Sequence, residues 1–260
     1  MQFREYGPER KDAILLLHGG GLSWWNYREA AELLCGEYRV ILPILDGHAG
    51  SDRPFTTIED NAAEIIAFID ERLGGSVPLI GGLSLGGQVL LEMLSQRSRI
   101  CAHALVESAA VLPSRLTHAL IAPVFGGSYG LIRSRTFARL QFRSLLMKPE
   151  LFEDYVRDTG RIRKADMIAF LKANTSYALK DAFRDAAADV RVFVGEKETR
   201  EILRSAEAIR EMRPSCTLRR LRGLRHGEFS INHADRYADT VREILHGPAP
   251  EVTAEERLLP

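Results

Sequence analysis

Short apolar runs alternate along the chain with longer stretches in which apolar positions recur every three or four residues. The runs predict strands, and the spaced patterns predict helices with one buried face. The expected strands cover residues 1–6, 13–17, 38–42, 77–80, 102–106, 190–194 and 217–221, and the expected helices cover residues 25–34, 57–73, 88–96, 201–212 and 234–245. Strands that alternate with helices predict an α/β fold with a mostly parallel central sheet and helices on both faces.

The alternation breaks between residues 113 and 185, where helical patterns continue without a convincing strand. The clearest helices there are expected at 131–147 and 149–158. An insert of this kind predicts a helical cap over the carboxyl ends of the strands, where open α/β sheets bind ligands. The predicted division is a core in two parts, 1–112 and 186–246, a helical cap at 113–185, and a C-terminal tail at 247–260.

Two features of the expected cap have two interpretations each. The apolar stretch 116–127 either lines an acyl or alkyl pocket or forms ordinary cap core. Arg135, Arg139 and Arg143 recur every four residues and so share one helix face. Such a face usually meets solvent, but segment 113–185 carries 13 Lys and Arg against 7 Asp and Glu. The second interpretation is therefore attraction of anionic substrates or lipid surfaces.

The whole chain carries 35 basic and 35 acidic side chains, so its formal charge gives no sign of a nucleic-acid partner. No apolar run has the length of a membrane span, and the polar first residues do not resemble a secretory signal. Cys35, Cys101 and Cys216 are widely spaced and odd in number, which fits neither a zinc site nor a disulfide framework. We expect a cytoplasmic protein with free thiols, and a tail that is mobile or packs against a second copy in a homodimer.

One glycine-flanked serine carries most of the chemical information. The run Gly82-Leu83-Ser84-Leu85-Gly86 follows an expected strand and precedes an expected helix. Small neighbours allow strand and helix backbones to approach closely around an exposed serine hydroxyl. The free N–H groups and positive dipole end of the helix favour a developing anion there. Ser84 is therefore the candidate nucleophile for acyl transfer, provided that a base reaches it.

A second glycine cluster, His18-Gly19-Gly20-Gly21, follows the expected strand 13–17. Backbone N–H groups in such a turn can stabilise the oxyanion of a tetrahedral intermediate. The two donors would be the N–H of Leu85 and that of Gly20 or Gly21, with Gly20 preferred. His18 is expected to brace this loop. The alternative is an ordinary glycine turn after a strand.

His226 lies between the last expected strand and the last expected helix, where it can lean over the sheet edge towards Ser84. Its near-neutral pKa suits a group that takes the serine proton and later returns it. Glu198 follows the expected strand 190–194 and is the preferred acid to orient the imidazole. Glu107, after the preceding strand, and Glu196 remain candidates for that role.

These motifs, together with the Asp46–Ser51 loop, occur in the order typical of the α/β-hydrolase family, which the chain resembles over residues 1–246. The resemblance implies an α/β-hydrolase fold with an inserted helical cap. It also implies a serine hydrolase that cleaves a partly apolar carboxylic ester through an acyl-enzyme, with a Ser84-His226-Glu198 triad and no metal or organic cofactor. Many members carry Asp where this chain has Glu198.

The resemblance leaves other activities open: hydrolysis of a C–C bond in a diketone, of thioesters, lactones or amides, or a ligand-binding receptor with little turnover. It also implies that Leu22, Trp24 and Trp25 lie near the pocket mouth, although all three could instead pack under the sheet edge. The Asp46–Ser51 loop is interpreted as structural.

Overall fold

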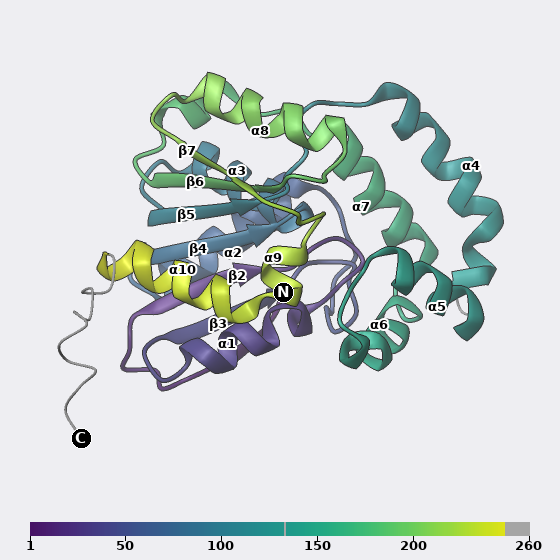
Figure 1. Cartoon of the computed structure of the whole chain (residues 1–260), viewed down its shortest axis with the longest axis horizontal. Coiled ribbons are helices and arrows are strands. Elements are labelled where there is room, and N and C mark those ends of the chain that lie inside the picture. Colours follow the sequence, from purple (N-terminus) through teal and green to yellow (C-terminus); the bar gives the residue numbers. More distant parts are fainter. Residues whose placement is uncertain (133, 248–260) are drawn as a thin grey trace.

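The computed structural model of the chain describes residues 1–132 and 134–247. Its sheet has seven strands in the order β1-β3-β2-β4-β5-β6-β7, with β1 antiparallel to β3 and every other pair parallel (Figure 1). The strands are β1 (Gln2–Tyr6), β2 (Ala13–Leu17), β3 (Arg39–Ile44), β4 (Val77–Leu83), β5 (Cys101–Glu107), β6 (Asp189–Gly195) and β7 (Thr217–Leu221). The predicted mostly parallel α/β sheet is therefore confirmed.

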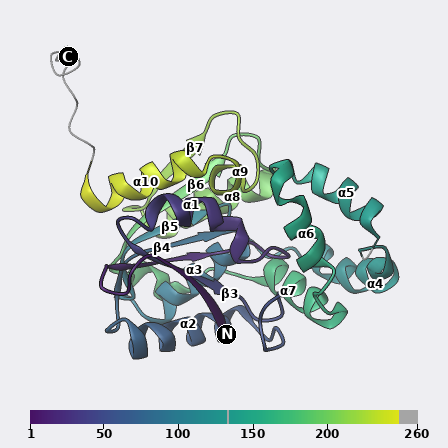
Figure 2. The same ribbon diagram turned by 90° about the horizontal axis from the view of Figure 1, so that it is seen from below.

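Helices cover both faces of the sheet, as predicted. The core helices are α1 (Arg28–Leu34), α2 (Ile58–Arg72), α3 (Leu85–Gln96), α8 (Arg200–Met212), α9 (Glu228–Asn232) and α10 (Ala234–His246), with the 3₁₀ helix η1 at Trp24–Tyr27. Figure 2 shows α1 and α10 on one face and α2 and α3 on the other. Strand β2 divides its side chains between these two cores, Leu15 and Leu17 facing one and Ile14 and Leu16 the other.

The sheet register brings the carboxyl ends of the central strands together. Strand β4 lies between β2 and β5, with Leu17 opposite Gly82 and Glu107 opposite Leu83. Strand β6 continues the same edge, with Phe193 opposite Glu107. Loops that follow β2, β4, β5 and β6 must therefore emerge at one edge of the sheet, where the candidate residues of the sequence are concentrated.

The chain between β5 and β6 contains α4 (Arg115–Ile132), α5 (Arg135–Ser144), η2 (Pro149–Leu151), α6 (Phe152–Thr159), α7 (Lys164–Ser176) and η3 (Asp181–Asp185). No strand occurs in the described part of this segment. Helices α4, α5 and α6 lie to the right of the sheet in Figure 1, and Figure 2 again separates them from it. The insert is therefore helical, and the domain boundaries drawn from the sequence stay a prediction.

The expected helix 131–147 is wrong, because two helices share that segment. Helix α4 ends at Ile132, and α5 begins after Ser134, whose extended backbone forms its N-cap. Residues 133–136 are all polar, so the sequence does contain a local signal for this break, which the helical pattern on either side outweighed. The side chains of Arg135, Arg139 and Arg143 are exposed, as both interpretations of this helix face require, so the choice between them stays a prediction. Residues 248–260 of the expected tail lie outside the described residues.

Helix α4 buries only part of its apolar surface: Ile121 is buried and Phe125 packs against the core, whereas three leucines face solvent. Leu116, Leu120 and Leu131 are 73%, 50% and 53% exposed. The opposite side of α4 packs along α7, with His118 Nδ1 donating a hydrogen bond to the Lys172 carbonyl oxygen at 3.2 Å. Across residues 1–132 and 134–247, no helix combines the length and the apolar character needed to cross a membrane.

Candidate active site

Ser84 lies between β4 and α3 with φ 52° and ψ −110°, a backbone conformation that is uncommon for a residue with a side chain. The glycines around it allow the turn to be this tight. A Cβ atom on Gly86 would lie 2.1 Å from the Leu17 carbonyl oxygen, and one on Gly82 would lie 2.4 Å from the Gly86 carbonyl oxygen. The Ser84 N–H donates to the Glu107 carbonyl oxygen at 2.8 Å, which ties the turn to β5.

Two backbone N–H groups beside Ser84 are left without an acceptor in the described part of the chain. Gly19 N–H donates to Asn26 Oδ1 at 3.2 Å, and Gly21 N–H donates to His48 Nε2 at 3.0 Å. The N–H of Gly20 between them has no such partner, nor has that of Leu85 at the first position of α3. A Cβ atom on Gly20 would lie 3.5 Å from the Leu85 side chain, so the two segments are in contact.

Two buried histidines hold the glycine loop. His18 Nε2 accepts the Leu45 N–H at 3.1 Å, and its Nδ1 donates to the Gly19 carbonyl oxygen at 2.9 Å. His48 Nδ1 donates to the Asp46 carbonyl oxygen at 3.1 Å while its Nε2 accepts from Gly21. Burial lowers the pKa of His18 to about 3 and that of His48 to about 4. Both rings are therefore neutral near pH 7, and both nitrogens of each ring are engaged in hydrogen bonds, which suits a bracing role.

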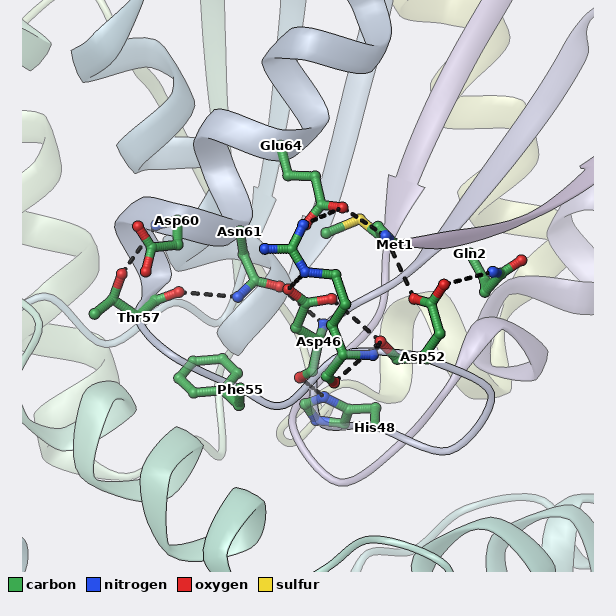
Figure 3. A network of polar contacts seen from close by, with 12 residues as sticks. Met1, Gln2, Asp46, His48, Asp52, Phe55, Thr57, Asp60, Asn61 and Glu64 are labelled. Carbon is green, nitrogen blue, oxygen red and sulfur yellow. Dashed lines mark hydrogen bonds and ion pairs between the residues drawn. The ribbon is translucent and has the colours of Figure 1, made fainter.

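The loop that carries His48 is fixed by its own polar contacts (Figure 3). The Asp46 N–H donates to Asn61 Oδ1 at 2.9 Å, and the Ser51 hydroxyl donates to Asp46 Oδ1 at 3.1 Å. Asn61 belongs to α2, where the Thr57 hydroxyl accepts the Asp60 N–H at 2.9 Å and so forms the predicted N-cap. The loop therefore connects α2 to the glycine loop, through Asn61 at one end and His48 at the other.

His226 and Glu198 meet beside Ser84. His226 Nδ1 donates to Glu198 Oε2 at 3.1 Å, and the other carboxylate oxygen, Oε1, accepts from the Ser108 hydroxyl at 2.5 Å. The Glu198 side chain is 1% exposed, whereas that of His226 is 46% exposed. Burial opposes protonation of the His226 ring, but the hydrogen bond and charge of Glu198, with the charge of Glu107, raise its pKa above the usual 6.5.

The two alternative acids make different contacts. Glu107 Oε1 accepts the Ser230 N–H at 3.3 Å, and burial raises the pKa of this carboxyl to about 7. Glu196 Oε2 accepts the Gly223 N–H at 2.9 Å. Of the three candidate acids, it is Glu198 that makes the hydrogen bond to the His226 ring.

Ser84 and His226 line one cavity of about 80 Å³. Its other lining residues are glycines and apolar side chains: Gly19, Gly20, Gly227, Leu22, Leu83, Leu145, Met147 and Ile231. No hydrogen bond joins the Ser84 hydroxyl to the His226 ring within the described residues, and such contacts are often loose before substrate binds. A carbonyl group in this cavity could approach the hydroxyl, the imidazole and the two backbone N–H groups together.

The three expected pocket residues lie in different places. Leu22 lines the cavity. Trp24 lines a separate groove, with the guanidinium groups of Arg4 and Arg28 at 5.4 and 5.0 Å from its ring centre. Trp25 is buried in the core, and its Nε1 donates to Asp158 Oδ2 at 2.9 Å. Among the side chains that the structure describes, the cavity lining includes none from α4, so the described part of the apolar stretch 116–127 does not line this pocket.

The sequence did not single out Ser108 or Asn26 as part of the site. Ser108 has φ 55°, again in the left-handed region, and its hydroxyl reaches Glu198 across 90 residues of sequence. Its only sequence signal is its position directly after Glu107 at the end of a strand. In the described part of the chain, no group of three His, Cys, Asp or Glu side chains is arranged to hold a metal ion.

Comparison with known proteins shows which family the chain belongs to. The family model described as the alpha/beta hydrolase family matches residues 14–240, and the chain therefore belongs to that family. No curated protein sequence matches the chain.

Several solved structures share the fold. A malate-bound thermophilic esterase from Thermogutta terrifontis is 19% identical, covering 94% of this chain and 92% of its own, with a TM-score of 0.76. A hydrolase from Pseudomonas aeruginosa PA01 is 16% identical over 94% and 93% of the two chains, with a TM-score of 0.78. The enol-lactonase from Burkholderia xenovorans LB400 is 17% identical over 94% and 95%, with a TM-score of 0.76. At these identities the likeness shows the fold.

Proposed function

We propose that the protein is a serine hydrolase that cleaves a partly apolar carboxylic ester through an acyl-enzyme on Ser84. The observation that supports this most is that Ser84 and His226 line the same cavity, while Glu198 accepts a hydrogen bond from Nδ1 of the His226 ring. The structural neighbours described as an esterase and an enol-lactonase act on ester bonds, open-chain or cyclic, and so favour the same bond type.

The first half of the reaction forms the acyl-enzyme. His226 Nε2 removes the proton of the Ser84 hydroxyl as the oxygen attacks the ester carbonyl carbon. The N–H groups of Gly20 and Leu85 donate to the oxyanion, an effect worth about 3–4 kcal/mol per donor. Glu198 holds the ring through Nδ1 and stabilises the imidazolium. The imidazolium then gives its proton to the leaving alcohol, and the carbonyl re-forms on Ser84.

The second half releases the acid. His226 removes a proton from a water molecule, which attacks the acyl carbon, and the proton returns to the Ser84 oxygen as the ester to the enzyme breaks. The apolar side chains Leu22, Leu83 and Ile231 supply contact area for the acyl or alkyl part of the substrate.

The test is turnover of p-nitrophenyl esters together with labelling by a fluorophosphonate. We expect the wild type to hydrolyse the esters and to be labelled, and Ser84→Ala to lose both, with a fall in kcat of at least about a thousandfold. Full activity or persistent labelling in Ser84→Ala would exclude this mechanism. A wild type that is labelled but does not hydrolyse esters would favour diketone cleavage or a receptor role instead.

A further inference from the structure

The roof of the cavity comes from the segment between α5 and η2. Leu145 and Met147 from that segment line the cavity, opposite Ile231 of α9. Met147 is 8% exposed, while Leu145 and Leu146 are 41% and 42% exposed. The segment therefore forms a wall of the cavity that is itself partly exposed to solvent.

One side chain fixes this segment at two points. Asn232 Nδ2 donates to the Leu146 carbonyl oxygen at 2.7 Å, and the Lys148 N–H donates to Asn232 Oδ1 at 3.2 Å. Both contacts are to backbone, so they hold the path of the chain and not one rotamer. Leu146, whose carbonyl oxygen accepts the first of these hydrogen bonds, has φ 54°. A residue with a side chain adopts this conformation where its surroundings hold it there.

The small volume of the cavity limits what can be bound while its walls stay in place. A cavity of about 150 Å³ lined by apolar side chains accommodates benzene. The cavity beside Ser84 has about 80 Å³, roughly half of that volume, which suits an acyl chain of about two to four carbons. A longer chain that extends along Leu145 and Met147 presses against the segment whose Leu146 and Lys148 backbone groups bind Asn232.

We propose that Asn232 determines the acyl-chain length that the protein accepts, by fastening residues 146–148 over the cavity. The inference rests on the proposed esterase function. Asn232 does not line the cavity and acts through the segment that it holds, so it is a positioning residue. Its neighbour Ile231 lines the cavity, and both belong to the short helix that follows the His226 loop.

A second contact on the same segment provides a matched control. The Lys148 ammonium pairs with Glu29 at 2.5 Å on the surface, where such a pair contributes little to stability. Lys148→Ala removes this ion pair but keeps the Lys148 N–H that Asn232 binds. It therefore removes a surface contact of the segment and leaves both hydrogen bonds to Asn232 in place.

The experiment measures kcat and KM for p-nitrophenyl acetate, butyrate, hexanoate and octanoate. It compares the wild type with Asn232→Ala, Asn232→Asp, Lys148→Ala and Met147→Ala, with thermal melts to verify folding. We expect the wild type to prefer acetate and butyrate. In Asn232→Ala the octanoate-to-butyrate ratio of kcat/KM should rise about tenfold, mainly through a lower KM for octanoate. Asn232→Asp keeps the acceptor but loses the donor, so its ratio should lie between the two. Lys148→Ala should match the wild type.

Met147→Ala enlarges the cavity while leaving Asn232 in place, and it should raise the same ratio even if Asn232→Ala does not fold. The proposal is overturned if the wild type prefers octanoate, if neither Asn232→Ala nor Asn232→Asp changes the ratio, or if Lys148→Ala changes it equally. Absence of ester turnover and of fluorophosphonate labelling in the wild type would refute the proposed function and this inference with it. Turnover with an unchanged chain-length profile would refute the inference alone.

Discussion

The carboxyl groups of Glu198 and Glu107 both lie near the His226 ring, and their hydrogen bonds indicate different roles. Glu198 accepts the His226 Nδ1 hydrogen, whereas Glu107 binds the Ser230 N–H. Burial raises the pKa of Glu107 to about 7, so at neutral pH a large fraction of it carries a proton. A protonated acid is a weak electrostatic partner for an imidazolium, and this favours Glu198 as the residue that orients the ring.

We therefore predict different losses in Glu198→Gln and Glu107→Gln. Glu198→Gln should lower kcat/KM by about three to four orders of magnitude, as removal of the acid does in such triads. Glu107→Gln should cost less than about tenfold. If Glu107→Gln is the damaging change and Glu198→Gln is not, the assignment of the acid is wrong.

The same pair predicts a pH effect. Activity needs the neutral ring, and Glu198 and Glu107 hold the pKa of His226 above 6.5, so kcat/KM should rise with pH through a midpoint above 6.5. Glu107→Gln removes the fraction of negative charge that Glu107 still carries, which is the smaller of the two contributions, so its midpoint should move slightly to lower pH. The measurement is a pH profile of kcat/KM from 5 to 9, and an unmoved midpoint would contradict the coupling.

At the scale of elements, the end of β5 contacts the Ser84 turn, the helix that follows the His226 loop, and Glu198. The Glu107 carbonyl oxygen accepts the Ser84 N–H, its side chain accepts the Ser230 N–H behind the His226 loop, and the Ser108 hydroxyl donates to Glu198. The register that sets Glu107 opposite both Leu83 and Phe193 makes these contacts possible. One strand end therefore aligns three segments that are far apart in the sequence.

Ser108 offers a test of this alignment. Ser108→Gly and Ser108→Ala both remove the hydroxyl that holds Glu198, so each should lower kcat by about ten times without loss of folding. Only Ser108→Ala also keeps a Cβ atom at φ 55°, so it should be less stable than Ser108→Gly by about 1 kcal/mol. Unfolding in urea measures the second difference. Wild-type activity in both variants would show that Glu198 needs no such partner.

Elements whose signals are local could be predicted from the sequence, and those that depend on register could not. The Thr57 cap, the strand-to-helix turn around Ser84 and the alternation of strands with helices rest on neighbouring residues. The break between α4 and α5 has only a short signal, the polar run 133–136, within a longer helical pattern. The role of Ser108 depends on which strands pair. The sequence named Ser84, His226 and Glu198 as candidates, and the structure brings them together, while their chemical roles stay predictions.

At the scale of the whole molecule, the buried neutral histidines connect the site to acid stability. His48 has a pKa of about 4 in the folded state against about 6.5 when unfolded. Between these values the unfolded chain binds a proton that the folded one does not. The stability from His48 is therefore complete above pH 6.5 and is lost as the pH falls towards 4, by about 1.4 kcal/mol per pH unit.

Glu107 and His226 have raised pKa values in the folded state, so they change the stability with pH in the opposite direction. A variant is therefore needed to isolate the contribution of His48. His48→Gln keeps an acceptor for the Gly21 N–H but cannot titrate. Its free energy of unfolding should fall less between pH 6.5 and 4 than that of the wild type, by up to about 3 kcal/mol. Urea unfolding at several pH values measures this difference, and parallel curves for the two proteins would contradict it.

The half-exposed His226 ring has a consequence for the timing of the cycle. Its carboxylate partner is sealed from solvent, but the imidazole itself borders bulk water. On the mechanism that we propose, a ring with almost half of its surface accessible to water can exchange protons with water directly. No relay through other side chains is then required between the two halves of the reaction.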